Sequence, residues 1–214
     1  MQKSLRAEYN SVMLSSNMKE IKVCNKCVMD STDPLISFDS NGVCNHCIEA
    51  KEKLRLGWFP NAQGEEYLKS VSYEIRQHGT NKEYDCIIGV SGGVDSSYLL
   101  HVAKNIMKLR PLVVHVDAGW NSEIAVKNIE HLVKALDLDL YTYVVDWEEM
   151  KDLQVAFLKS QIADQDLPQD YAFFSGLYKF AKKNKIKYVL TGGNFSTECC
   201  REPEEWGGFP GIDT

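Results

Sequence analysis

The chain has 214 residues, which is room for one ordinary domain and a small additional module. Its 44% hydrophobic and 25% charged residues are those of a soluble globular protein. A net charge of −6 argues against a nucleic-acid partner, because a large RNA footprint carries a basic patch. No apolar run approaches the roughly 18 residues of a membrane span, and the N-terminus lacks the apolar core of a signal peptide. We therefore expect a cytoplasmic protein with no membrane association.

Two Cys-x-x-Cys pairs, separated by sixteen residues, dominate the first part of the chain. This spacing is typical of structural zinc sites, in which each pair turns two thiolates toward one point. We predict a zinc-binding module over residues 21–50, preceded by a flexible N-terminal segment at 1–20. A closed four-cysteine site has no open coordination position, so its role should be structural; an iron–sulfur cluster is the alternative. The predicted ligands are Cys24, Cys27, Cys44 and Cys47.

Residues 33–42, between the cysteine pairs, predict a short strand and a hairpin turn that ends in Asn-Gly. His46 lies between two predicted ligands and could replace one, although an exposed knuckle residue is the simpler interpretation. A helical connector is expected over residues 51–83. Its helices are predicted at 48–56 and 65–78, with a loop between them and Gly79 as a C-cap.

From residue 84 to residue 214 the chain alternates between buried strands and amphipathic helices. This order predicts an α/β domain with a doubly wound parallel sheet and right-handed crossovers. Ligands of such sheets bind beyond the carboxyl ends of the strands. The predicted strands are 84–90, 111–117, 140–145 and 186–190, and the predicted helices are 96–109, 123–136, 147–162 and 171–184.

The first of these strands runs into residues 91–97, Ser-Gly-Gly-Val-Asp-Ser-Ser, and then into a helix. A glycine-rich turn at a helix N-terminus offers unpaired N–H groups and the positive end of the helix dipole, which suit a phosphate. Ser91, Ser96 and Ser97 add hydroxyl donors. Asp95 would repel phosphate unless a cation lay between them, so its carboxylate implies Mg²⁺. The alternative is an ordinary turn with a serine N-cap.

Two further strand ends carry unusual residues. His115 to Trp120, after the second strand, are mostly small and leave room for a flat ring, although His115 can be a core histidine and Asp117 a loop residue. Residues 191–194, Thr-Gly-Gly-Asn, again allow backbone to approach a ligand, or form a plain turn. Glu198 and Arg201 beyond them could orient a substrate or neutralise phosphate. The acidic segment 164–170 could hold Mg²⁺ or sugar hydroxyls, or be a solvated loop with an N-cap.

The segment 91–97 resembles the PP-loop of the ATP pyrophosphatase superfamily. Those enzymes cleave ATP between the α and β phosphates, adenylate a carbonyl oxygen and release pyrophosphate. The resemblance implies catalytic roles for Ser91, Asp95 and Ser96, an adenosine pocket at the second strand end, and an α-phosphate and substrate edge at the last. The ATP-binding residues implied are Val90, Ser91, Gly92, Gly93, Val94, Asp95, Ser96, Ser97, His115, Val116, Asp117, Ala118, Gly119, Thr191, Gly192, Gly193 and Asn194.

The sequence around these motifs is similar to that of the N-acetyl sugar amidotransferase family. The resemblance covers residues 22–200, in which Cys-Val-Met-Asp-Ser-Thr-Asp-Pro at 27–34 and Gly-Val-Cys-Asn-His-Cys at 42–47 are the most distinguishing segments. These proteins act in lipopolysaccharide O-antigen and nonulosonic-acid (pseudaminic or legionaminic) biosynthesis. The family implies that ATP adenylates the N-acetyl oxygen of a sugar or sugar nucleotide. Ammonia then displaces AMP and leaves an acetamidino group.

No glutaminase motif is visible, so the resemblance implies a glutaminase partner with a cyclase-like barrel that supplies ammonia. Family members continue well beyond the position of Thr214. We therefore expect the PP-loop domain at 84–214 to be incomplete at its C-terminal end and the chain alone to lack full activity. The sugar, its acetamido position and the oligomeric state do not follow from the sequence.

Two other interpretations remain open. Some PP-loop enzymes thiolate tRNA, and several carry paired Cys-x-x-Cys sites; a reactive cysteine at Cys199 or Cys200 would suit sulfur transfer. The acidic charge and the lack of an evident RNA-binding module argue against this interpretation. The other possibility is a zinc-ribbon module attached to a non-catalytic nucleotide-binding domain, which would bind ATP tightly without releasing pyrophosphate.

Overall fold

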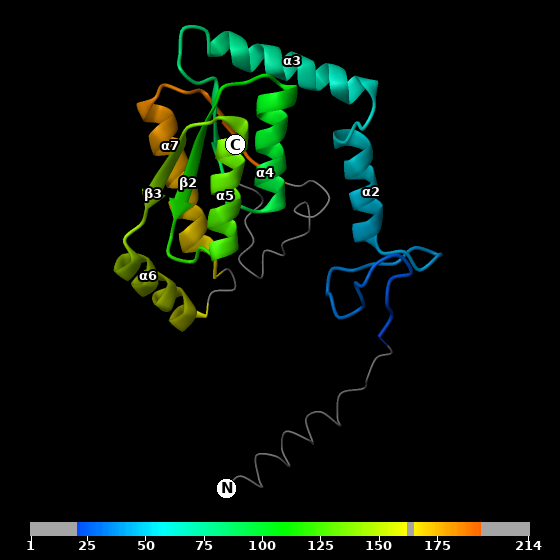
Figure 1. The fold of residues 1–214 in the computed structure, drawn as a ribbon. Helices are drawn as coiled ribbons and strands as arrows, with labels where there is room; N and C mark the ends of the chain where they lie inside the picture. The colour runs from blue at the N-terminus through cyan, green and yellow to red at the C-terminus, as the bar shows by residue number, and fades with distance from the viewer. Residues whose placement is uncertain (1–20, 162–164, 194–214) are drawn as a thin grey trace, which may run out of the picture. The chain divides into compact units, whose positions relative to one another are not determined.

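The computed structural model describes residues 21–161 and 165–193 (Figure 1). The chain divides into two compact units, Met1–Trp58 and Phe59–Thr214. The division follows the first described helix, α2 (Asn45–Gly57), so the next helix, α3 (Ala62–His78), belongs to the second unit. Each unit is considered on its own.

The first unit has very little regular structure before α2. Two isolated antiparallel bridges, Val23 to Asp30 and Phe38 to Cys44, hold its loops. The predicted hairpin turn is present: the N–H of Gly42 donates to the carbonyl of Asp39 at 3.0 Å, and Gly42 has a φ of +73°. Among the described residues of this unit, only Cys24 and Cys44 are buried. An apolar core therefore cannot be what holds these residues in place.

The second unit is built on a four-stranded sheet in the order β3-β2-β1-β4. All three strand pairs are parallel, as predicted. The chain moves outward from β1 to β3 and then crosses to the other side of β1 to form β4. The carboxyl ends of β1 and β4 therefore flank a topological switch point, where ligands of open α/β sheets bind. The strands are β1 (Cys86–Gly89), β2 (Pro111–Asp117), β3 (Leu140–Val144) and β4 (Tyr188–Leu190).

Helices cover both faces of this sheet, with α4 and α5 on one side and α7 on the other (Figure 1). Alternate residues of β1 separate the two cores: Ile88 packs with Ile75, Leu100 and Ile129, whereas Ile87 packs with the α7 side. Because both faces are buried, β1 and β2 are nearly continuous apolar runs, which explains why they were predictable. The remaining helices are α4 (Val94–His101), the π-helix η1 (Val102–Ile106), α5 (Glu123–Leu136), α6 (Trp147–Ser160) and α7 (Leu167–Lys183).

Four helix starts differ from the sequence-based predictions. Helix α2 begins at Asn45 rather than at 48. Helix α4 begins at Val94 rather than at 96, and with η1 it ends at Ile106 rather than at 109. Helix α7 begins at Leu167 rather than at 171, because Pro168 occupies the first turn, where a proline needs no N–H partner. Helix α3 begins at Ala62 within the predicted loop, because the side chain of Asn61 accepts from the N–H groups of Gln63 and Gly64 and caps it.

Asp85, just before β1, connects the segments that lead into β1 and β2 at the amino-terminal edge of the sheet. Its carboxylate is 4% exposed and accepts from the backbone N–H of Arg110 at 2.8 Å and from the guanidinium at 2.6 Å. The Arg110 guanidinium also donates to the carbonyls of Gly79 and Lys82. Gly79 caps α3 as predicted, and a Cβ there would lie 1.9 Å from the Asp85 carboxylate. This network closes the sheet at the edge opposite to the strand ends that carry the predicted site.

Replacing Asp85 with alanine should lower the free energy of unfolding of the second unit by about 2–3 kcal/mol. This loss is smaller than that for a fully buried ion pair, because the side chain of Arg110 is half-exposed. Urea unfolding followed by circular dichroism measures this change. Glu148→Ala, which removes an exposed ion pair with Lys151 on α6, is the matched control and should cost less than about 1 kcal/mol. Equal losses for both variants would contradict a structural role for the Asp85 network.

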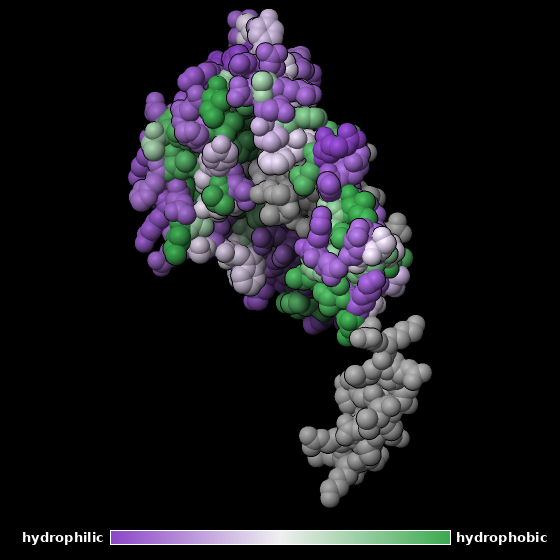
Figure 2. Space-filling view, turned by 90° about the vertical axis from the view of Figure 1, so that its right-hand side faces the viewer, coloured by the Kyte–Doolittle hydropathy of each residue, from purple (hydrophilic) through white to green (hydrophobic). Residues whose placement is uncertain are grey.

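Among the helices that the structure describes, none combines the length and apolarity that a membrane crossing needs. The face of the molecule in Figure 2 is mostly hydrophilic, with apolar side chains in smaller areas between. Several large apolar side chains are nevertheless exposed, such as those of Val94 and Tyr98 on α4 beside the predicted phosphate loop.

Candidate functional site

The loop between β1 and α4 has the geometry that its glycines predict. Gly92 has a φ of +76°, and a Cβ at this position would lie 2.4 Å from the carbonyl oxygen of Ala125 on α5. Only glycine fits both the backbone conformation and the contact. Gly93 is the N-cap residue of α4, and no side chain caps this helix. The first-turn N–H groups of α4 are therefore left for an anionic ligand.

The serine hydroxyls of this loop face one another. Ser91 Oγ lies 3.3 Å from Ser96 Oγ, and Ser96 Oγ also accepts from the N–H of Ser91 at 3.3 Å. The N–H of Gly93 points at Ser91 Oγ at 3.4 Å, whereas Ser97 donates to the carbonyl of Gly93 at 2.7 Å. Ser91 and Ser96 thus sit among backbone N–H donors at the start of a helix, and Ser97 is used within the helix.

The end of β4 lies against this loop. A Cβ at Gly192 would be 3.1 Å from the backbone nitrogen of Ser96, so the β4 backbone approaches the first turn of α4 closely. Thr191 and Gly192 line the same pocket as Ser91. The structure therefore brings together the two glycine pairs that the sequence singled out, although 100 residues separate them. Asn194, predicted with them, lies outside the described residues, as do Glu198, Cys199, Cys200 and Arg201.

At the end of β2, His115 is buried and links β1 to the loop that precedes α5. Its Nδ1 lies 2.9 Å from the carbonyl of Val90, and its Nε2 lies 3.0 Å from Asn121 Nδ2. Because a carbonyl can only accept, Nδ1 carries the proton and Nε2 accepts from the amide. Asp117 accepts from the N–H of Gly119 at 2.9 Å and shapes its own loop. Gly119, with a φ of +89°, packs against Trp147.

Two pockets open at this edge of the sheet, and Ser91, Val116 and Phe173 line both. The first has a volume of about 240 Å³ and mostly apolar walls. The second has about 260 Å³ and a larger polar share, which includes amides and hydroxyls among apolar side chains. Asp117 and Gly119 line neither of them. The first pocket includes Val90, Phe174, Leu177, Leu190, Thr191 and Gly192, and the second includes His115, Ala118, Trp120, Asn121, Ser122 and Gln169.

Three residues of this edge were not predicted. Trp120 is 63% exposed, and its indole is fixed by a hydrogen bond to Gln154 at 2.9 Å and by an edge contact with Trp147. Asn121 holds His115, and Asn128 on α5 donates to the carbonyl of Gly92 at 3.1 Å. No short motif marks these side chains, because their contacts depend on how α5 packs against the loop.

Asp95 lies in the first turn of α4 and is exposed. Mg²⁺ in nucleotide sites is commonly held by one or two carboxylates together with substrate phosphates, and a single exposed carboxylate beside a phosphate cradle fits that pattern. Of the second predicted acidic site, Asp164 lies outside the described residues, Asp166 is the N-cap residue of α7, and Asp170 lines the apolar pocket. In the part of the chain that the structure describes, these carboxylates do not assemble into a metal-binding group.

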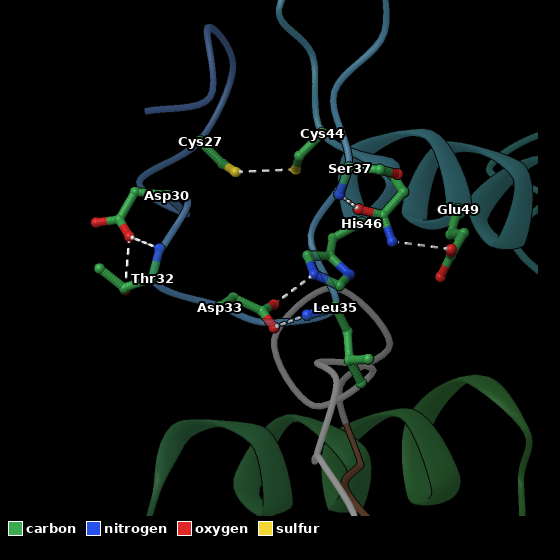
Figure 3. Close-up of polar contacts among 10 residues, drawn as sticks. Cys27, Asp30, Thr32, Asp33, Leu35, Ser37, Cys44, His46 and Glu49 are labelled. Atoms are coloured by element: carbon green, nitrogen blue, oxygen red, sulfur yellow. Dashed lines mark hydrogen bonds and ion pairs between the residues drawn. The ribbon is translucent and has the colours of Figure 1, made fainter. Parts of the chain in front are cut away.

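The four cysteines of the first unit form the predicted cluster, and their sulfur atoms all lie within 4.8 Å of one another. Cys27 and Cys44 face each other at 3.6 Å (Figure 3), and Cys24 and Cys47 lie 4.0 Å apart. A tetrahedral zinc site with Zn–S bonds of about 2.3 Å requires sulfur separations of about 3.8 Å. The observed arrangement therefore fits zinc.

The surroundings of these thiols act in opposite directions on their ionisation. Burial raises the pKa of Cys24, but N–H groups of Cys44, Lys26 and Cys27 outweigh this effect and bring its pKa down to about 6. Burial and the neighbouring thiols raise the pKa of Cys47 to about 12. Four thiols so close together cannot all ionise without a cation, so metal binding must release protons.

His46 is not one of the ligands, and it is less exposed than expected. Its Nε2 lies 2.8 Å from Asp33 Oδ2, and Figure 3 shows the ring directed toward this carboxylate. Both side chains are about 85% buried, with exposures of 15% and 14%. His46 thus joins the two sides of the zinc module rather than replacing a cysteine.

Comparison with known proteins identifies a family and a relative of the chain. Residues 85–193 match the family described as phosphoadenosine phosphosulfate reductase domain. An uncharacterized protein from Methanocaldococcus jannaschii is 25% identical over 186 residues, which are 85% of this chain and 63% of that protein. The chain thus spans less than two thirds of this relative.

Solved structures with related folds include the NH3-dependent NAD synthetase of Campylobacter jejuni, with a TM-score of 0.44 and 17% identity over 62% of this chain and 58% of that one. The NMN synthetase of Francisella tularensis has a TM-score of 0.46 and 20% identity over 61% of this chain and 54% of that one.

Proposed function

Because the chain belongs to the phosphoadenosine phosphosulfate reductase domain family, a member of the PP-loop ATP pyrophosphatase superfamily, we propose that it uses ATP to activate a carbonyl oxygen. One observation carries the proposal. The loop that contains Ser91 and Ser96, the uncapped N-terminus of α4 and the Gly192 backbone meet at the switch point of a parallel sheet. This arrangement supplies donors for a pyrophosphate group and leaves pockets on both sides of Ser91.

We further propose that the carbonyl belongs to the N-acetyl group of a bacterial surface-glycan sugar. The amide oxygen would attack the α-phosphorus of ATP while the bond to the β-phosphate oxygen breaks, and pyrophosphate would leave. Ammonia would then add to the activated carbon, and AMP would depart with the former amide oxygen, leaving an acetamidino group. The sequence resemblance in the zinc module supports this substrate class. The second pocket supports it too, because its amides and hydroxyls suit an uncharged polyhydroxylated ring.

In this mechanism the residues of the chain hold and orient the reacting groups. The N–H groups at the start of α4, with the hydroxyls of Ser91 and Ser96, face the negative charge that develops on the leaving pyrophosphate. When bound, Mg²⁺ would supply positive charge between Asp95 and the phosphate oxygens. Ammonia is proposed to come from a glutaminase subunit with a cyclase-like barrel.

The sulfur-transfer alternative needs a reactive cysteine. Among the described residues, four cysteines form the metal cluster, and burial raises the pKa of the fifth, Cys86, to about 12. Cys86 is therefore protonated at neutral pH, and the cluster cysteines are candidate metal ligands; Cys199 and Cys200 lie outside the described residues. Amide activation by ATP requires no reactive thiol, so this proposal depends only on the described loop and pockets.

Asp95→Ala should reduce ATP-dependent pyrophosphate release at least about 100-fold, because it removes the carboxylate proposed to hold Mg²⁺ beside the phosphates. The assay couples pyrophosphate to a phosphatase, with ammonia and an N-acetylated sugar nucleotide present. Asp152→Ala, which removes an exposed carboxylate from α6, is the control and should leave the rate unchanged. Wild-type rates in Asp95→Ala would refute the PP-loop assignment.

A further inference from the structure

We propose that Asn128 and His115 are positioning residues that orient two peptide groups of the loop, Val90–Ser91 and Gly92–Gly93, so that their N–H groups face the phosphate site. This inference rests on the proposed function, because it assigns to these side chains the preorganisation of the same phosphate loop. It concerns the loop's rigidity and not its direct contacts with a ligand.

The first peptide group joins Gly92 to Gly93. Its carbonyl oxygen accepts from Asn128 Nδ2 at 3.1 Å, and its N–H points toward Ser91 Oγ at 3.4 Å. In a trans peptide the C=O and the N–H lie in one plane and point in opposite directions. By holding the carbonyl on the α5 side, Asn128 therefore directs the Gly93 N–H toward the hydroxyl pair.

The second peptide group joins Val90 to Ser91 and is held in the same way. Its carbonyl accepts from His115 Nδ1 at 2.9 Å, and its N–H points toward Ser96 Oγ at 3.3 Å. His115 is buried, with 8% exposed, and Asn121 fixes its tautomer by donating to Nε2 at 3.0 Å. The ring is thus a rigid link from β2 to the loop rather than a freely moving pocket wall.

Helix α5 provides the support for the Asn128 contact. Its backbone at Ala125 is in contact with Gly92, and Asn128 lies three residues further along the same helix face. Ile129 is buried in the sheet core, and Ser122 caps the helix by accepting from the N–H of Ala125. A helix anchored in this way holds donors in place before the ligand arrives, which is the condition for preorganised electrostatic stabilisation.

The test measures calorimetrically how the full chain binds inorganic pyrophosphate, ATP and adenosine. Asn128→Ala should weaken pyrophosphate and ATP binding about 10- to 100-fold, as expected for a displaced donor set, and leave adenosine binding unchanged. Asn184→Ala is the matched control, because Asn184 also donates from its amide to a backbone carbonyl, that of Phe180, far along the chain from the loop. It should leave all three affinities unchanged.

Variants of His115 provide an independent test of the same inference. His115→Leu removes the donor to Val90 and should weaken pyrophosphate binding. His115→Asn, whose amide nitrogen occupies nearly the position of Nδ1, should restore at least part of the affinity. The inference fails if Asn128→Ala binds pyrophosphate normally, or if its three affinities fall together with the melting temperature, which would indicate a general structural role. If the wild-type chain binds neither pyrophosphate nor ATP, the proposed function fails as well.

Discussion

Removal of zinc is expected to unfold the first unit while the sheet of the second unit stays folded. Of the described residues between 21 and 58, only two cysteines are buried, so a bound metal would take the place of a hydrophobic core. Structural zinc contributes about 10–16 kcal/mol of apparent binding free energy in comparable small modules. Cys44→Ser removes the most deeply buried ligand, with 0% exposed, and should have the same result as chelation.

Hydrogen exchange resolved by mass spectrometry separates the two units. In Cys44→Ser we expect amides of the module to exchange at rates of an unfolded chain, while residues 86–90 and 111–117 keep their protection. His46→Ala is the control, because His46 pairs with Asp33 and does not ligate; it should keep one zinc per chain. Full protection of the module without metal, or iron found in place of zinc, would overturn the assignment.

Replacing Gly92 with alanine should abolish nucleotide binding and destabilise the second unit. A left-handed conformation costs about 1–2 kcal/mol for a residue with a Cβ. In addition, the methyl group would lie 2.4 Å from the Ala125 carbonyl, so the loop and α5 must move apart. We expect ATP affinity to fall at least about 100-fold, because a displacement of hydrogen-bond donors by about 1 Å can already cause a loss of that size.

Gly93→Ala is the matched control for this substitution. Gly93 has a φ of −79°, and an added Cβ would meet only Ser91 Oγ, at 3.3 Å. The variant should unfold at the wild-type temperature, whereas Gly92→Ala should not. If the two variants have the same stability and the same ATP affinity, the loop is not held by α5 in the way described.

The sequence predicted best those elements whose side chains repeat with a clear period. Strand β2 has the predicted bounds, 111–117, because both of its faces are buried and most of its residues are apolar. Helix starts were less predictable. The sequence places Val94 and Asp95 in a turn although they begin α4, and it leaves Leu167 and Pro168 outside the predicted helices although they begin α7. Glycine, serine, aspartate and proline are common both in turns and at helix starts, so local composition does not separate the two.

In the candidate site, too, the features with a clear local sequence signal were the predictable ones. Glycine pairs and cysteine pairs are local signals, so the phosphate loop, the β4 end and the metal cluster could be placed from the sequence. From the sequence alone, Asn121 is an ordinary residue before a helix, and Asn128 is an ordinary residue on a helix surface. Their roles arise only when α5 packs against Gly92, which no motif encodes. Likewise, the sequence left His115 undecided between core and pocket, and the structure gives it both a buried ring and a place in the pocket wall.

The most direct test of the proposed reaction follows the oxygen of the acetyl group. The chain is incubated with ATP, Mg²⁺, ammonia and an N-acetylated sugar nucleotide whose amide carbonyl carries a heavy oxygen isotope. Nuclear magnetic resonance of phosphorus and mass spectrometry then analyse the products. Our account predicts AMP that contains the labelled oxygen, unlabelled pyrophosphate, and a sugar in which NH has replaced one oxygen. Formation of ADP and phosphate, or AMP without the label, would contradict activation of the carbonyl by adenylation.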